Sequence, residues 1–184
     1  MMKRIISTIL LAISVAVCSF AQINTDRVLA IGRNALYFED YVLSIQYFNN
    51  VIAVKPYLPE PFLYRSIAKV YLEDYTGAEQ DATACLERNP FVVTAYQVRG
   101  IARQNLKDYD GAISDFLKGL QIQPENKVFL RSLGVSYALK DDFAKADSCF
   151  ESFISIFPSE PSAYITRAQL KMEMNDSVQA LANL

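Results

Sequence analysis

Residues 93–126 read VTAYQVRGIARQNLKDYDGAISDFLKGLQIQPEN and decide the fold. Apolar side chains recur at helical spacing on both sides of Asp108. An aspartate between two such segments can accept hydrogen bonds from the exposed N–H groups that begin the second helix. Pro124 ends this helix, because proline cannot donate the next backbone hydrogen bond. The stretch therefore predicts two antiparallel helices joined by a turn at Asp108.

The same pattern recurs along the chain with a period of 34 residues. The prolines in this register are Pro56, Pro90, Pro124 and Pro158, and the aspartates are Asp40, Asp74, Asp108, Asp142 and Asp176. Two registers with one interval indicate a tandem structural repeat. Counted from Thr25, the repeats are 25–58, 59–92, 93–126 and 127–160, followed by a partial repeat over 161–184.

Two positions in every unit are occupied by small residues. The eighth residues are Gly32, Ser66, Gly100, Gly134 and Ala168, and the twentieth are Ser44, Ala78, Ala112, Ala146 and Ala180. Small side chains at facing positions let two helices approach closely, while larger residues at the fourth and twenty-fourth positions fill the space around them. The sequence therefore predicts an all-α stack of antiparallel helix pairs.

These residues resemble the tetratricopeptide repeat family, whose pattern includes an aromatic residue, glycine, alanine, phenylalanine and a closing proline. In the third unit the matching residues are Tyr96, Gly100, Ala112, Phe116 and Pro124. The resemblance covers residues 25–184 and implies a right-handed superhelix, an α-solenoid. Two units depart from the pattern. Ser66 and Ala168 replace the glycine, and Lys69 and Lys171 stand where the family prefers tyrosine.

The first 21 residues have the organisation of a secretory signal peptide. Lys3 and Arg4 make a basic start, residues 5–17 are apolar, and Ser19 and Ala21 are small residues before a cleavage site. We expect a mature chain over residues 22–184, exported to the periplasm or cell envelope of a Gram-negative bacterium. Membrane contact would then occur through the signal peptide alone.

Two alternatives remain for this segment. The uncharged stretch over residues 5–21 has 17 residues, which is the lower limit for crossing a bilayer, so it could be an N-terminal anchor. A lipoprotein signal ending at Cys18 is the second alternative, although Val17 stands where such signals carry a small residue.

The composition excludes several classes of function. The 184 residues include no histidine, carry a formal charge of -2 and contain no basic block longer than Lys3-Arg4. Nucleic-acid binding requires clustered basic charge, and histidine is the commonest general base and metal ligand. Gly-rich phosphate loops, CxxC pairs and GxSxG elbows are also absent from the sequence. We therefore expect no enzyme activity, cofactor, metal, small-molecule substrate or nucleic-acid partner.

Arginine at the seventh position of a unit occurs together with aspartate 16 residues later. The pairs are Arg65 with Asp81 and Arg99 with Asp115. Their joint presence predicts an ion pair between the two helices of a unit. Coincidence among five units is the alternative, and Arg167 with Asn183 fits the pattern only in part.

The resemblance also implies a binding face, because arrays of this family hold peptide segments on an inner wall built from the first helix of each unit. Carried over position by position, the wall residues are Leu29, Arg33, Leu36, Tyr37, Leu63, Ile67, Val70, Tyr71, Gln97, Ile101, Gln104 and Arg131, with Asn105, Val135, Ala138 and Leu139 beside them. The first two units present an apolar, aromatic wall, and the third is polar. A partner segment, the chain's own remaining parts or a second copy could cover it.

The expected function is therefore an exported scaffold that binds protein or peptide segments on its concave face. One alternative is the N-terminal recognition module of a larger envelope enzyme or sensor. Leu184 falls inside the expected second helix of the fifth unit, so we expect the natural protein to continue beyond it as a longer repeat protein. A further expectation is self-assembly through this uncapped last repeat.

Overall fold

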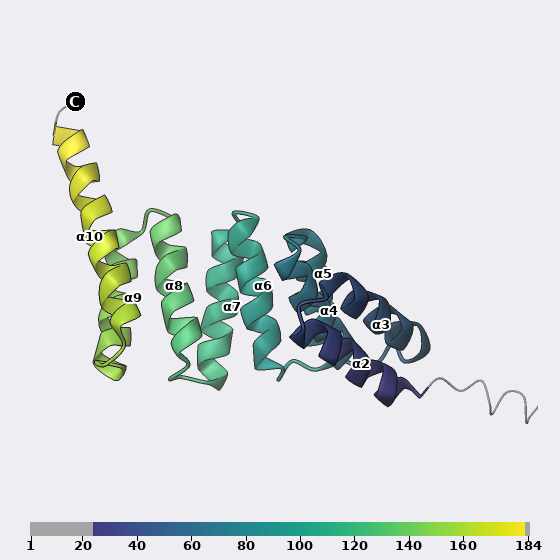
Figure 1. Cartoon of the computed structure of the whole chain (residues 1–184). Coiled ribbons are helices and arrows are strands. Elements are labelled where there is room, and N and C mark those ends of the chain that lie inside the picture. Colours follow the sequence, from purple (N-terminus) through teal and green to yellow (C-terminus); the bar gives the residue numbers. More distant parts are fainter. Residues whose placement is uncertain (1–23, 183–184) are drawn as a thin grey trace, which may run out of the picture.

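The computed structural model describes residues 24–182, and every regular element in this range is an α-helix (Figure 1). The helices are α2 (Thr25–Tyr37), α3 (Tyr41–Val54), α4 (Glu60–Tyr71), α5 (Tyr75–Arg88), α6 (Val93–Asn105), α7 (Tyr109–Ile122), α8 (Lys127–Leu139), α9 (Phe143–Ile156) and α10 (Pro161–Ala182). Within this range, no helix combines the length and the apolar character that a bilayer crossing requires. The predicted signal peptide, residues 1–21, lies outside the described residues.

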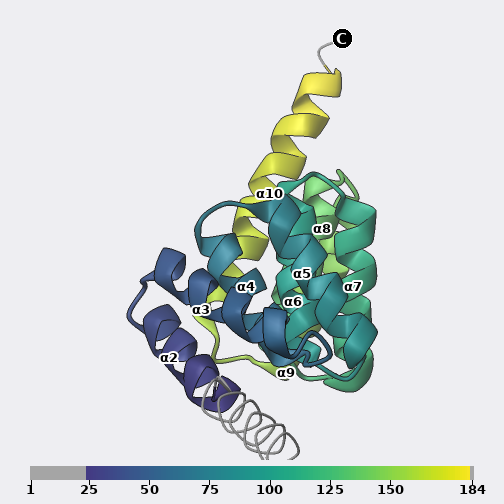
Figure 2. The ribbon, with the colours of Figure 1, turned by 90° about the vertical axis from the view of Figure 1, so that its right-hand side faces the viewer.

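The helices form a linear stack of antiparallel pairs. Each first helix packs against the second helix of its own unit, and each second helix also packs against the first helix of the next unit. The first helices α2, α4, α6 and α8 also contact one another in succession, so they form one continuous side of the stack (Figures 1 and 2). The predicted all-α solenoid of 34-residue helix pairs is confirmed.

Four of the five register aspartates cap the second helices as predicted. The backbone N–H groups of Leu43, Gly77, Gly111 and Lys145 donate to Asp40, Asp74, Asp108 and Asp142 at 3.1, 2.9, 3.0 and 3.3 Å. Each second helix also ends two residues before its register proline, so the predicted role of the prolines in helix termination is confirmed.

The residue before each capping aspartate has a left-handed backbone. The φ angles of Glu39, Glu73, Lys107 and Asp141 are 63°, 59°, 65° and 62°. Glycine adopts this conformation without steric cost, whereas a residue with a Cβ atom does not. The four turns therefore share one geometry, and the exposed side chain at this position varies in charge without changing the turn.

The small residues in the first helices make room for aromatic rings from the second helices. A Cβ atom added to Gly32, Gly100 or Gly134 would lie 2.7, 2.4 or 2.8 Å from the ring of Phe48, Phe116 or Phe150. The facing residues Ser44, Ala78, Ala112 and Ala146 are fully buried. The predicted contact is confirmed, with the added detail that the glycine accommodates the twenty-fourth residue of its own unit.

The fifth unit departs from the other four. Helix α10 continues over Pro161–Ala182 and extends beyond the stack in both views (Figures 1 and 2). The predicted helix start at Asp176 is therefore wrong. An aspartate begins a new helix only where the segment after it packs back onto the stack, and here the residues after Asp176 continue α10 instead.

Candidate functional site

The candidate site is the side of the stack that carries the predicted wall residues of α2, α4, α6 and α8 and that α10 continues, called here the first-helix face. All twelve predicted wall residues retain access to solvent. The exposed members are Arg33, Tyr37, Tyr71 and Arg131, and the half-buried members are Leu29, Leu36, Leu63, Ile67, Val70, Gln97, Ile101 and Gln104. The tyrosines are the most open apolar side chains of the set, with Tyr37 81% and Tyr71 63% exposed.

A hollow of about 550 Å³ lies at the N-terminal end of this face. We call it the N-terminal hollow, and its lining is Ala30, Arg33, Asn34, Leu36 and Tyr37 from α2 and Tyr64 from α4. The Arg33 guanidinium lies 5.3 Å from the centre of the Tyr64 ring, which stacks on Phe48 at 5.7 Å. The hollow therefore combines aromatic surface, one cation and one amide.

Tyr64 is a site residue that the carried-over wall positions missed. Tyr64 is the sixth residue of its unit and directly follows the wall residue Leu63 in the sequence. The available signal was an aromatic residue next to a wall position of the second unit, since the unit before it carries the wall residue Arg33. Its stacking on Phe48 fixes the ring in the N-terminal hollow.

The middle of the first-helix face is occupied by contacts within the chain. The Gln104 side chain donates to Ser136 Oγ at 2.7 Å and to the Ser132 carbonyl at 3.3 Å, both on α8. Ile101 packs against the core cluster that contains Phe116 and Phe129. These two predicted wall residues therefore hold α6 against its neighbours, and the third unit offers less free surface than the sequence implied.

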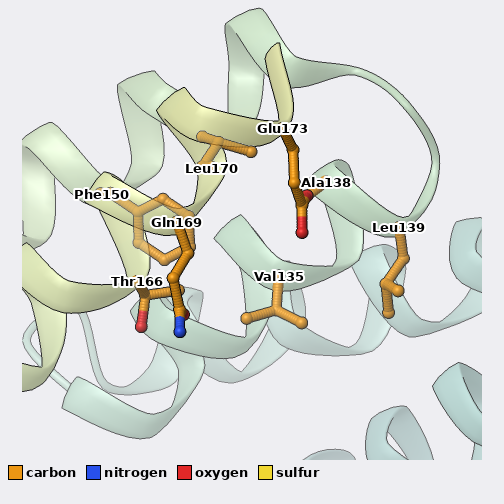
Figure 3. Close-up of a pocket in the computed structure, with 8 residues that line it drawn as sticks. All are labelled: Val135, Ala138, Leu139, Phe150, Thr166, Gln169, Leu170 and Glu173. Atoms are coloured by element: carbon orange, nitrogen blue, oxygen red, sulfur yellow. The ribbon is translucent and has the colours of Figure 1, made fainter. Parts of the chain in front are cut away.

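A second hollow, of about 270 Å³, lies between α8 and α10 (Figure 3). Val135, Ala138 and Leu139 line it from α8, as the carried-over positions predict. From α10 and α9 the lining residues are Thr166, Gln169, Leu170, Glu173 and Phe150. Phe150 and Leu170 are nearly buried, whereas Gln169 and Glu173 reach from α10 toward Val135 and Ala138 (Figure 3).

Buried ion pairs support the face from behind. Arg65 donates to both oxygens of Asp81 at 2.7 and 2.5 Å, and Lys69 lies 2.9 Å from the same carboxylate. Arg99 donates to both oxygens of Asp115 at 2.9 and 2.6 Å, and Arg103 lies 2.9 Å from it. The predicted Arg–Asp pairs are confirmed, and each carboxylate holds a second cation that the sequence analysis did not assign.

A third carboxylate, Asp147, follows the same pattern with different spacing. Arg167 donates to it at 2.6 Å and Lys171 at 2.9 Å, and these hydrogen bonds lower the pKa of Asp147 to about 2. The partner of Arg167 is thus on α9 of the preceding unit. Asn183, which the sequence offered as a partial match for Arg167, lies outside the described residues.

The two central arginines also link neighbouring units. Arg65 donates to Asn49 on α3 at 2.6 Å, and Arg99 donates to Thr83 on α5 at 3.2 Å. Each guanidinium therefore joins three consecutive helices. Bidentate, charge-assisted contacts of this kind fix both distance and orientation, so they hold the first helices at a constant spacing.

The chemistry of this face is suited to binding. Within the part of the chain that the structure describes, no three His, Cys, Asp or Glu side chains gather closely enough to hold a metal ion. Asp147, whose pKa is lowered to about 2, is bound by the two cations Arg167 and Lys171, so we assign it a structural role. What the face offers is two hollows, exposed tyrosine rings and a rigid helical frame.

Comparison with known proteins supports the repeat assignment. Residues 93–126, the unit closest to the family pattern, match the tetratricopeptide repeat family. A search of curated proteins finds no match. Among solved structures, the chain is similar to MamA (residues 41 to the end) from Desulfovibrio magneticus RS-1, with a TM-score of 0.77 and 18% identity over 86% of this chain and 89% of that one.

Two further structures extend this comparison. TTC0263, a thermophilic TPR protein of Thermus thermophilus, gives a TM-score of 0.66 and 18% identity over 86% of this chain and 87% of that chain. The second TPR domain of human RPAP3, solved with the HSP70 peptide SGPTIEEVD, gives a TM-score of 0.57 and 24% identity over 58% of this chain and 89% of that chain. At these identities the likeness shows the fold.

Proposed function

We propose that this chain is an exported scaffold that binds an extended segment of a partner protein on its first-helix face. The observation that carries the proposal is the N-terminal hollow, where Tyr37 is 81% exposed beside Arg33 and Tyr64. A soluble protein gains nothing by leaving such a surface wet, and exposed aromatic side chains are typical of interaction sites.

Two features of the face support an extended ligand. Hollows lie at both ends of it, one on α2 and α4 and the other between α8 and α10. The Arg–Asp networks fix the spacing of the helices between them, so a partner would meet a surface that is already organised. The RPAP3 domain with its HSP70 peptide shows that a similar fold can hold a peptide.

The partner class differs from chaperone tails. The resemblance to the tetratricopeptide repeat family implies that Leu29, Tyr64 and Val98 stand where its carboxylate-binding members carry polar residues. Val98 is 6% exposed and Tyr64 is stacked between Arg33 and Phe48, so neither side chain can supply such a clamp. The proposed ligand therefore inserts an apolar side chain into the N-terminal hollow.

The test is selection of binding peptides from a displayed library on the purified protein, followed by measurements on two matched variants. Ala30 is exposed and lines the N-terminal hollow, so Ala30→Trp fills the hollow without removing a contact. Ala53 is exposed on α3, outside the hollow, so Ala53→Trp is the control. We expect Ala30→Trp alone to abolish binding of the selected peptides. Equal binding by both variants would refute the proposal.

Export is the second part of the proposal and rests on the sequence of residues 1–21. Its test is fractionation of the native cell and determination of the N-terminus of the protein. We expect an envelope fraction and a mature chain that begins at Gln22. A cytoplasmic protein that retains Met1 would refute export, and a lipid on Cys18 would favour the lipoprotein alternative.

Self-association through α10 is a second proposal, which one observation favours. Ile165 and Met172 are 59% and 68% exposed on this helix. A hollow of about 290 Å³ nearby is lined by Ile154, Tyr164 and Ala168 together with the cations Arg167 and Lys171. Sedimentation at rising concentration tests it. A dimer that Ile165→Lys with Met172→Lys disrupts would support it, and a monomer at all concentrations would refute it.

A further inference from the structure

The turns of the first two units carry an unusual amount of exposed apolar surface. Tyr37, the last residue of α2, and Phe38, the first residue of the turn after it, are 81% and 77% exposed. Tyr71 and Leu72, at the same positions of the next unit, are 63% and 43% exposed. We call these four residues, with Glu39 and Glu73 beside them, the acidic aromatic edge.

The two turns lie side by side and form one surface. The ring of Tyr41, which follows the first turn, stacks on the ring of Tyr71 from the second turn, with centroids 4.8 Å apart and planes 5° from parallel. Within the first turn, Tyr37 and Phe38 meet edge to face at 5.2 Å. These contacts hold the rings in place while large parts of them remain exposed.

The acidic aromatic edge also carries negative charge that no salt bridge among the described residues offsets. Glu39 and Glu73 are exposed next to the capping residues Asp40 and Asp74. Among the residues that the structure describes, no salt bridge reaches any of these four carboxylates. The pKa of Tyr41 is raised above its ordinary value, mainly by desolvation and secondly by the charge of Glu39.

The corresponding turns of units three and four have no aromatic residue at the positions of Tyr37 and Phe38, although Leu106 and Leu139 there are 40% and 47% exposed. Their left-handed residues are Lys107 and the exposed Asp141, which has no salt bridge among the described residues, whereas the carboxylates next to them have basic partners. Arg103 lies 3.7 Å from Asp108, Lys140 pairs with Asp110, and Lys145 lies 2.6 Å from Asp142. The combination of exposed rings and unpaired carboxylates is therefore a property of the first two turns and does not follow from the repeat itself.

We propose that the acidic aromatic edge binds a basic segment of a partner protein, one that carries lysine or arginine beside apolar side chains. The cations would lie between Glu39 and Glu73 and over the faces of Tyr37 and Tyr71, where ring and carboxylate attract them together. The apolar side chains of the segment would cover Phe38 and Leu72. This site does not depend on the N-terminal hollow, although Tyr37 borders both.

The charge variant Glu39→Lys/Glu73→Lys tests the site. Lysine already stands at this position in the third turn, where Lys107 has a φ of 65°, so the variant is expected to fold. Lys107→Glu is the matched control because it changes a charge at the same position of another turn. The probes are short capped peptides that combine lysines with leucines, and peptides of the same length in which glutamates replace the lysines.

Binding is followed by fluorescence anisotropy at low and high salt, and the contact is located by NMR. We expect the lysine peptide to bind the natural protein, to shift the resonances of Tyr37, Phe38 and Tyr71, and to weaken as salt rises. Glu39→Lys/Glu73→Lys should weaken binding about tenfold or more, because each reversal replaces an attraction with a repulsion. Lys107→Glu should leave the affinity unchanged.

The inference would be overturned by no binding of the lysine peptide, by equal binding of the glutamate peptide, or by equal affinity of the charge variant and the natural protein. The Ala30→Trp variant separates this site from the first-helix face. It should retain the lysine peptide even where it loses the peptides selected for the N-terminal hollow. Loss of the lysine peptide in Ala30→Trp alone would place that peptide in the hollow and would also overturn the inference.

Discussion

Arg99→Leu should destabilise the fold more than the double variant Arg99→Leu/Asp115→Leu. The single change removes hydrogen bonds of 2.9 and 2.6 Å from Asp115, whose side chain is 2% exposed, and one of 3.2 Å to Thr83. Breaking a buried pair by removing one partner costs about 3–5 kcal/mol. Because Arg103 remains 2.9 Å from Asp115, we expect a loss at or below the lower end of this range, about 2–3 kcal/mol.

The double variant leaves no buried charge at position 115, and Arg103 keeps Glu79 at 2.8 Å. Its loss should be smaller than that of the single variant by about 1 kcal/mol or more. Urea unfolding followed by circular dichroism at 222 nm measures both, since the chain has no tryptophan. Arg131→Leu, at an exposed position on α8, is the control and should change stability by less than about 0.5 kcal/mol. Equal losses in the single and double variants would refute the paired-charge reasoning.

Three further changes test the helix contact, the turns and the third ion pair. Gly100→Leu should lower the free energy of unfolding by about 1–3 kcal/mol or more, because even a Cβ atom there would lie 2.4 Å from Phe116. An unchanged melting temperature would contradict the contact. Lys107 has a left-handed backbone with a φ of 65°, so Lys107→Gly should raise the free energy of unfolding by about 0.5–1 kcal/mol. Lys118→Gly, inside α7, should lower it by a similar amount, and losses of equal size in both variants would show that the turn is not strained. The pKa of Asp147 is about 2, below the ordinary value, so its contribution is present above about pH 4 and is lost as pH falls toward 2. In Asp147→Asn, the free energy of unfolding should no longer fall through the loss of this contribution between about pH 4 and pH 2. The same dependence of stability on pH in the variant and the natural protein would contradict the ion pair.

Most of the fold could be predicted from periodic positions. The register of Asp108 and Pro124 and their equivalents gives helix starts and ends, and the small residues give the helix contact, because these features act locally and repeat in every unit. The continuation of α10 through Asp176 could not be read from this register. A capping residue begins a new helix only where the helix that follows can pack, and packing is a tertiary property.

The candidate site was less accessible to sequence reasoning. Lys69 and Lys171 looked like departures from the family pattern, yet they bind Asp81 and Asp147. The signal was present: each lies four residues after an arginine, which places both cations on one side of the helix. Gln104, in contrast, could not be separated from a free wall residue, because its partners Ser132 and Ser136 belong to the next unit and its rotamer decides the contact.

Site-specific photocross-linking in the native cell tests the central claim, binding on the first-helix face, most directly. A photoreactive residue is placed at Ala30 or Leu139, on the first-helix face, and at Gln46 or Gln121, which are exposed on α3 and α7. We predict cross-links to a partner protein from the first two positions and none from the other two. Cross-links from Gln46 or Gln121 alone would show that partners bind the outer helices and would contradict the account.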